Sequence, residues 1–155
     1  MAGKQHSYSA TLEWSDPQGT TRASTHSRNH IVRIAGKPEL SLSADPGFRG
    51  DPALHNPEDL LVVSLASCHM LWYLGLAARA GIAVKRYVDE AGGLMVEDAV
   101  KGGRFERVVL RPVVTIAAGG DVQKAMELHH EAHRQCFVAN SVNFPVECEA
   151  RIEVA

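Results

Sequence analysis

Residues 56–81 read NPEDLLVVSLASCHMLWYLGLAARAG, and the rest of the chain is arranged around this stretch. Both of its ends carry helix signals, because Asn56 suits the N-cap and Gly81 permits a left-handed stop. From Leu60 to Ala78 there is no Asp, Glu, Lys or Arg. The helix is therefore apolar nearly all round, and we expect the rest of the protein to bury it.

Length and charge favour one ordinary globular domain, residues 1–155. The net charge is −2 and like charges form no block, which speaks against a nucleic-acid partner or an anionic membrane surface. The first fourteen residues contain no apolar leader, so we expect a cytoplasmic protein. The apolar stretch is long enough to raise a transmembrane alternative. Its serines and His69, with amphipathic strands elsewhere, favour a buried core helix instead.

The segments before this helix have the pattern of strands and a loop. Alternation over residues 7–14, followed by extended segments at 30–36 and 39–44, predicts an antiparallel meander of three strands. A loop rich in Pro and Gly then leads directly into the helix. It contains Arg49, which makes it the loop of greatest chemical interest.

The segments after the helix predict more strands and a second helix. Residues 84–97 and 104–117 are expected as two strands joined by a glycine-containing turn, and residues 146–154 alternate as a final strand. Asp121 suits the N-cap of a second helix. By spacing, one face of that helix holds Val122, Ala125, Met126, His129, His133 and Cys136. The element order predicts an α+β fold with antiparallel sheets wrapped around a long central helix.

Three cysteines are available for chemistry or packing, since a cytosolic chain with three is a poor candidate for a disulfide framework. Cys148 lies on the apolar face of the final strand, where a small buried residue is expected. Cys68 and Cys136, taken singly, are also compatible with packing. Taken together they suggest a redox couple: a Cys68 thiolate attacks a peroxide and becomes a sulfenic acid, and Cys136 condenses with it to a disulfide. A thiolate in an apolar helix needs a neighbouring cation, so we expect an arginine beside it.

Two motifs carry a resemblance to a known family. Residues 55–61, HNPEDLL, and residues 64–69, SLASCH, place Cys68 ten residues after Glu58. This pattern resembles the NPE motif and cysteine of the OsmC/Ohr family, the osmotically inducible and organic hydroperoxide resistance proteins. The FRGD sequence before the helix and CHMLWYL within it are similar to the OsmC-like branch.

The resemblance implies an intertwined homodimer and a cysteine-based peroxidase of the oxidative stress response. Such an enzyme reduces organic hydroperoxides through a sulfenic acid and an intramolecular disulfide, with H₂O₂ as a further substrate left open. It implies that Cys68 is peroxidatic, that Cys136 resolves, and that Arg49 with Glu58 activates the thiolate. Arg22 is the alternative arginine, on the pattern of the hydroperoxide-resistance branch. The sequence CFVANS departs from the Pro and Ser that commonly follow the family's resolving cysteine, which weakens the assignment of Cys136.

Helix geometry adds a constraint that the motif does not contain. Ten helical residues separate Glu58 from Cys68 by about 15 Å along the axis and about 80° around it. One straight helix cannot bring both side chains to a single arginine. We therefore expect composite sites at a two-fold interface, where each copy's Glu58 lies near the other copy's Cys68.

The remaining expectations concern ligands and partners. Apolar Phe48, Leu71, Trp72 and Leu74 are available to form a substrate pocket, although each also suits a core. His129, His133 and Cys136 share a helix face and His69 adjoins Cys68, so zinc is an alternative. No CxxC or HExxH accompanies them, and we expect no metal and no bound cofactor. The expected partners are a second copy, a hydroperoxide and a thiol or dithiol reductant. The alternative function is a non-enzymatic dimer on the same fold that binds a small molecule or a metal.

Overall fold

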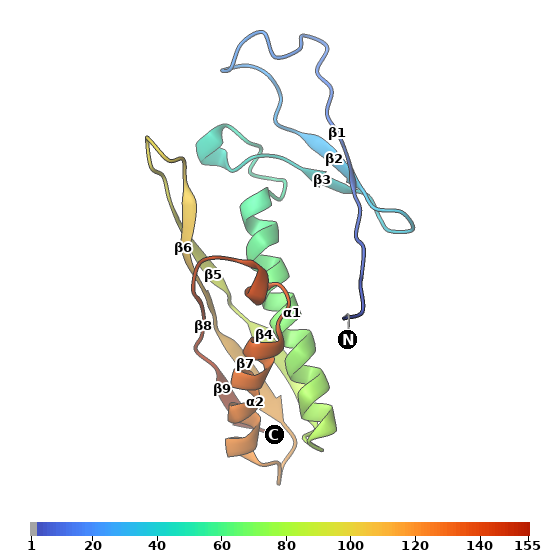
Figure 1. Cartoon of the computed structure of the whole chain (residues 1–155), viewed down its shortest axis with the longest axis vertical. Coiled ribbons are helices and arrows are strands. Elements are labelled where there is room, and N and C mark those ends of the chain that lie inside the picture. The colour runs from blue at the N-terminus through green and yellow to red at the C-terminus, as the bar shows by residue number, and fades with distance from the viewer. Residues whose placement is uncertain (1–2) are drawn as a thin grey trace. The chain divides into compact units, whose positions relative to one another are not determined.

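The computed structural model describes residues 3–155. The chain divides into two compact units, the first ending at Leu60 and the second being Leu61–Ala155. Figure 1 follows the elements of both units from blue to red along the chain. The single-domain organisation stays a prediction, and each unit is described by itself.

The first unit contains a three-stranded antiparallel meander, as the sequence predicted. Its strands β1 (Thr11–Glu13), β2 (His30–Arg33) and β3 (Leu40–Leu42) lie in the order β1-β2-β3. They are shorter than the alternating segments from which we inferred them. A single 3-10 turn, η1 (Pro46–Phe48), follows in the loop that carries Arg49.

The long helix α1 (Pro57–Arg79) has the ends that its sequence signals. The Asp59 amide donates to Asn56 Oδ1 at 2.8 Å, and the Asn56 amide donates back to Asp59 Oδ2 at 3.3 Å. This reciprocal arrangement is a capping box, with Asp in the place of the usual Glu. Gly81 has φ +72°, which confirms the left-handed stop. The helix is long and apolar enough to cross a membrane, but core helices pass the same test.

The second unit by itself covers only one face of α1. Its buried residues, Leu65, His69, Tyr73 and Ala77, follow each other at intervals of four and define one face. Val63 and Leu71 lie elsewhere on the helix and are 59% and 63% exposed. The helix is therefore apolar on faces that the other elements of the second unit leave accessible to water.

The two strands expected after α1 are each divided in two. They form β4 (Val84–Asp89), β5 (Gly92–Val96), β6 (Arg104–Leu110) and β7 (Pro112–Ile116), with β4 antiparallel to β7 and β5 antiparallel to β6. The interruption has a local cause. At the junction the Arg111 amide donates to Asp89 Oδ1 at 2.7 Å instead of to a strand carbonyl, and Pro112 has no N–H to donate.

The last part of the chain adds parallel strands to the α+β fold that the sequence predicted. Helix α2 (Val122–Gln135) is capped by Asp121, as predicted, and with the turn η2 (Ala139–Ser141) it carries the chain back across the unit. The final strand is divided into β8 (Val146–Cys148) and β9 (Arg151–Val154), which run parallel to β6 and β7. A crossover through a helix produces parallel neighbours. The sheets β5-β6-β8 and β4-β7-β9 are therefore mixed.

Two clusters of buried side chains form the core of the second unit. One joins Tyr73 and Ala77 of α1 to β7 and α2, through Val114, Ile116, Ala125, Leu128 and Ala132. The other joins Leu65 of α1 to Val108 and Leu110 of β6. Both clusters rest on α1, which therefore fixes the positions of the side chains between them on that helix, Cys68 and His69 among them.

Candidate functional site

Cys68 and Cys136 lie together although 68 residues separate them in the sequence. Cys68 is half-buried in the middle of α1, and Cys136 is buried at the C-terminal cap of α2. Burial raises the pKa of Cys136 to about 11, the nearby backbone amide of Ala139 opposes this, and a hydrogen bond with Cys68 adds to it. The Ala139 amide donates to Cys136 Sγ at 3.5 Å. Cys136 is therefore protonated at neutral pH.

Each thiol is followed closely in the sequence by an aromatic residue, Trp72 after Cys68 and Phe137 after Cys136. The rings of Trp72 and Phe137 meet edge to face, with centroids 5.5 Å apart, and Phe137 is 69% exposed. Leu71 and Leu74 belong to the same helix, while Phe48 is 40% exposed in the first unit. We did not predict Phe137, although its position directly after Cys136 was a usable signal.

The expected activating residues lie in the first unit. Arg49 ends η1 in a left-handed conformation with φ 67°, is exposed, and donates from Nη1 to the Ala23 carbonyl at 3.5 Å. Glu58 is in the first turn of α1, and its Oε2 is buried without a hydrogen-bond partner among residues 3–155. Arg22, the alternative, is exposed. The roles of these residues at Cys68 stay predictions.

A second group of polar side chains joins α1, α2 and β8. His69 Nε2 and His129 Nδ1 are 3.0 Å apart, and Cys148 Sγ lies 3.8 and 3.9 Å from these two nitrogens. His69 and His129 are 1% and 3% exposed. The sequence favoured plain packing for Cys148, and it grouped His129 with His133 and Cys136. In the structure His129 instead contacts His69 and Cys148, whereas His133 is exposed.

The face expected on α2 is correct only in part. Ala125, His129 and Cys136 are buried as predicted, whereas Val122 and Met126 are exposed. Leu128 and Ala132 complete the buried face. The buried face is therefore displaced relative to the expected one, which leaves His133 exposed.

Burial of the two imidazoles predicts a specific loss of stability in acid. Burial lowers the pKa of His69 to about 4 and that of His129 to about 3, so both stay neutral in the folded protein while the unfolded chain binds protons near pH 6.5. The contribution of these two neutral histidines to the free energy of unfolding is complete above pH 6.5 and is lost as the pH falls toward 3. We expect the free energy of unfolding by urea, measured with a chelator, to fall by on the order of 2 kcal/mol per histidine between pH 7.5 and 5.

The exposed neighbour His130 provides the matched control for this measurement. His129→Gln should flatten the pH dependence between pH 7.5 and 5, whereas His130→Gln should leave it unchanged, since His130 is exposed on the same helix. An identical slope in both variants would contradict the assignment of the acid sensitivity to the buried pair.

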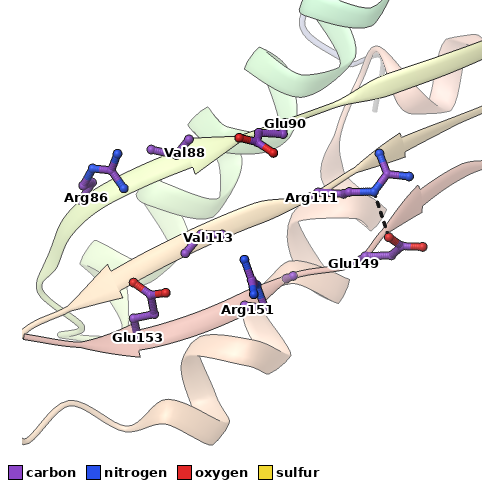
Figure 2. Close-up of a pocket in the computed structure, with 9 residues that line it drawn as sticks. Arg86, Val88, Glu90, Arg111, Val113, Glu149, Arg151 and Glu153 are labelled. Carbon is purple, nitrogen blue, oxygen red and sulfur yellow. Dashed lines mark hydrogen bonds and ion pairs between the residues drawn. The ribbon is translucent and has the colours of Figure 1, made fainter.

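The surface of the second unit is hollowed in several places. A hollow of about 650 Å³ lies over β4, β7 and β9 and is lined mainly by arginines and glutamates. Figure 2 shows these side chains along the strands, with the ion pair between Arg111 Nε and Glu149 Oε2 at 3.0 Å. None of the cysteines lines it. A second hollow, of about 390 Å³, is lined by His129, His130, His133 and Cys148.

Comparisons with known proteins agree with the motifs. The model of the family described as OsmC-like protein matches residues 50–151. None of the curated proteins matches the chain. An OsmC-like protein of unknown function from Vibrio cholerae is 30% identical, with a TM-score of 0.86 over 95% of this chain and 100% of that one.

Two further solved structures share the fold at lower identity. An organic hydroperoxide resistance protein from Elizabethkingia anophelis is 19% identical, with a TM-score of 0.72 over 99% of this chain and 100% of that one. An organic hydroperoxide resistance protein OsmC from Legionella pneumophila is 18% identical, with a TM-score of 0.68 over 97% of this chain and 99% of that one. Because the family model matches about two thirds of the sequence, the chain belongs to the OsmC-like protein family.

Proposed function

We propose that this protein is a thiol-dependent peroxidase that reduces organic hydroperoxides. The observation that carries the proposal is the pair formed by a half-buried Cys68 and a buried, protonated Cys136 on adjacent helix segments. Family membership supports a redox role connected with peroxides. The organic hydroperoxide resistance proteins that share the fold support the same class of substrate.

The reaction begins at the sulfur of Cys68. Its thiolate attacks the outer oxygen of the hydroperoxide, the O–O bond breaks, and the leaving alkoxide takes a proton to become an alcohol. Cys68 is left as a sulfenic acid. The Cys136 thiol then displaces hydroxide from that sulfur, so that a disulfide and water form. A thiol or dithiol reductant supplies the two electrons that reopen the disulfide.

The thiolate needs positive charge close to it, and we assign this role to Arg49, held in place by Glu58. Helix α1 runs without interruption from Pro57 to Arg79, so Glu58 and Cys68 of one copy remain about 15 Å apart along its axis. We infer that a second copy completes each site. Val63 and Leu71, exposed apolar residues of α1, provide a surface for that partner.

The proposed setting is the cytoplasm, and the proposed partners are a second copy of the chain, a hydroperoxide and a thiol or dithiol reductant. The balanced charge of the chain gives no reason to expect binding to nucleic acid or to an anionic membrane. No metal or bound cofactor takes part in the proposed peroxide chemistry, because the thiols carry the electrons.

The preference for one hydroperoxide over another tests both the proposed reaction and an apolar entrance to the site, formed by Trp72 and Phe137. Trp72 and Phe137 lie beside the residues that react, so a bulky hydroperoxide gains contact that H₂O₂ cannot make. With dithiothreitol as reductant, we expect cumene hydroperoxide to be consumed at least about ten times faster than H₂O₂, a difference of about 1.4 kcal/mol. The measurement is kcat/KM for each peroxide at matched protein concentration.

A variant at the exposed ring sharpens this test. Phe137→Ala should narrow the preference without unfolding the protein, because its side chain is 69% exposed. Equal rates for both peroxides in the unaltered protein would contradict the apolar entrance. Failure to consume either peroxide would contradict the proposed activity itself.

A second candidate function is a non-enzymatic binding protein on the same fold. The observation that favours it is the group formed by His69, His129 and Cys148. These side chains can hold a ligand without catalysing a reaction. This candidate predicts that Cys68→Ser retains function, whereas the peroxidase predicts its loss.

A further inference from the structure

We propose that His69, His129 and Cys148 form a binding site for one zinc ion, distinct from the Cys68–Cys136 pair. The three residues come from α1, α2 and β8, and their separations in the chain are 60, 19 and 79 residues. Only the fold brings them together. The proposal replaces the expectation of no metal that the sequence suggested, and it places the site on a different cysteine from the alternative considered there.

The distances between the donor atoms match the edges of a zinc tetrahedron. With bonds of about 2.05 Å to nitrogen and about 2.3 Å to sulfur, tetrahedral zinc holds two nitrogens about 3.4 Å apart and a nitrogen and sulfur about 3.6 Å apart. The observed separations are 3.0 Å between His69 Nε2 and His129 Nδ1, and 3.8 and 3.9 Å from these atoms to Cys148 Sγ. The ring centroids are 5.3 Å apart and the ring planes are inclined by 5°, so the two inner nitrogens point at each other without metal. Zinc would lengthen this contact by about 0.4 Å and would require each imidazole to turn its lone pair toward the ion.

The environment of the imidazoles keeps them in the neutral form that binds metal. Both rings are almost completely buried, and they stay uncharged at neutral pH because burial lowers their pKa values. The outer nitrogens, His69 Nδ1 and His129 Nε2, have no hydrogen-bond partner among residues 3–155. Both outer nitrogens would carry N–H groups in the zinc-bound state, so ordered water would have to supply their acceptors. The ring of Tyr73 stacks on His129, with centroids 4.1 Å apart, and holds that imidazole in place.

The protons balance when the ion binds. Without metal, one imidazole donates its N–H to the other across the 3.0 Å contact, and burial keeps Cys148 protonated by raising its thiol pKa to about 11. Zinc takes the inner lone pairs of both rings, so the ring that donated moves its proton to its outer nitrogen. The Cys148 thiol releases its proton to solvent and binds as thiolate.

An open side of the site provides access and the fourth ligand. His129 and Cys148 both line the hollow of about 390 Å³, so an ion can reach them from solvent and a water molecule can complete the tetrahedron. The donor set of two nitrogens and one sulfur suits zinc and not Mg²⁺ or Ca²⁺, which prefer oxygen. A bound ion would cross-link α1, α2 and β8. Its ligand on α1, His69, directly follows Cys68 in the sequence.

The test is metal binding by the full chain, with all cysteines kept reduced by a phosphine. After removal of metals by chelation, isothermal titration with ZnCl₂ should show one ion per chain with a Kd below about 1 μM. Cobalt(II) added in place of zinc should give a thiolate-to-cobalt charge-transfer band. Cys148→Ser and His129→Gln should each weaken zinc binding at least about a hundredfold, and Cys148→Ser should remove the band.

A double variant separates this site from the proposed redox pair. Cys68→Ser with Cys136→Ser leaves Cys148 as the only thiol, and it should keep both the zinc affinity and the cobalt band. Circular dichroism checks that each variant is folded. Loss of the band in the double variant, retention of zinc by Cys148→Ser, or no binding by the unaltered chain would each overturn the proposal. None of these outcomes depends on peroxide reduction, so the two proposals can fail separately.

Discussion

Replacing the sulfur of Cys68 by oxygen should abolish peroxide reduction. Cys68→Ser is expected to lower kcat/KM for cumene hydroperoxide by at least about a thousandfold, because a serine hydroxyl has neither the nucleophilicity of a thiolate nor the ability to hold the transferred oxygen as a sulfenic acid. The measurement is consumption of cumene hydroperoxide under excess dithiothreitol. The substitution changes one atom in a half-buried side chain, so the fold should remain.

The neighbouring residue supplies a control of the same size. Ser67→Ala also alters a single atom in the same helical turn, at an exposed position, and should keep activity within about twofold of the unaltered protein. Full activity in Cys68→Ser would mean that another residue reacts with the peroxide, and the binding-protein alternative would then be preferred.

Removing the guanidinium of Arg49 is expected to produce the second large effect. Arg49→Ala should slow peroxide reduction at pH 7 by about 10 to 100 times, since a lost positive charge destabilises the thiolate that reacts. The loss should be smaller at high pH, where the thiolate forms without help. Alkylation of the peptide containing Cys68 by iodoacetamide, followed by mass spectrometry across pH, should show the reactive form appearing at higher pH.

Arg22 provides the matched comparison, because the family resemblance leaves both arginines open. Arg22→Ala removes the same group from another exposed position of the first unit and should leave the alkylation profile in place. The reverse result, with a shifted profile for Arg22→Ala alone, would assign activation to Arg22. Unchanged profiles in both variants would contradict activation by either residue.

Local sequence signals predicted the helices well, because a single capping residue is enough to indicate where a helix begins or ends. Asn56, Gly81 and Asp121 each occupy the cap position that their chemistry suggests. The strands were harder, since the interruption near Arg111 depends on the Asp89 carboxylate reaching across the sheet to a backbone amide. The parallel pairing of β8 and β9 follows from the path of the chain through α2, which periodicity does not encode.

In the candidate site, too, local sequence signals predicted some features, whereas others depend on tertiary structure. The motif around Glu58 and Cys68 identified the thiol, and the structure places Cys136 against it. The surroundings of Cys148 were misjudged because alternation along a strand shows which side chains point inward but not what they meet there. His69 and His129 lie 79 and 19 residues away from Cys148, and only tertiary structure makes them neighbours.

The pairing of Cys68 with Cys136 during turnover is the centre of this account. The direct measurement is a disulfide map of the reduced, full-length protein after one equivalent of cumene hydroperoxide, by proteolysis and mass spectrometry without reductant. We predict a single link between Cys68 and Cys136 within one chain, and a free Cys148. An unreacted Cys68 thiol, or a link from Cys68 to Cys148, would contradict it.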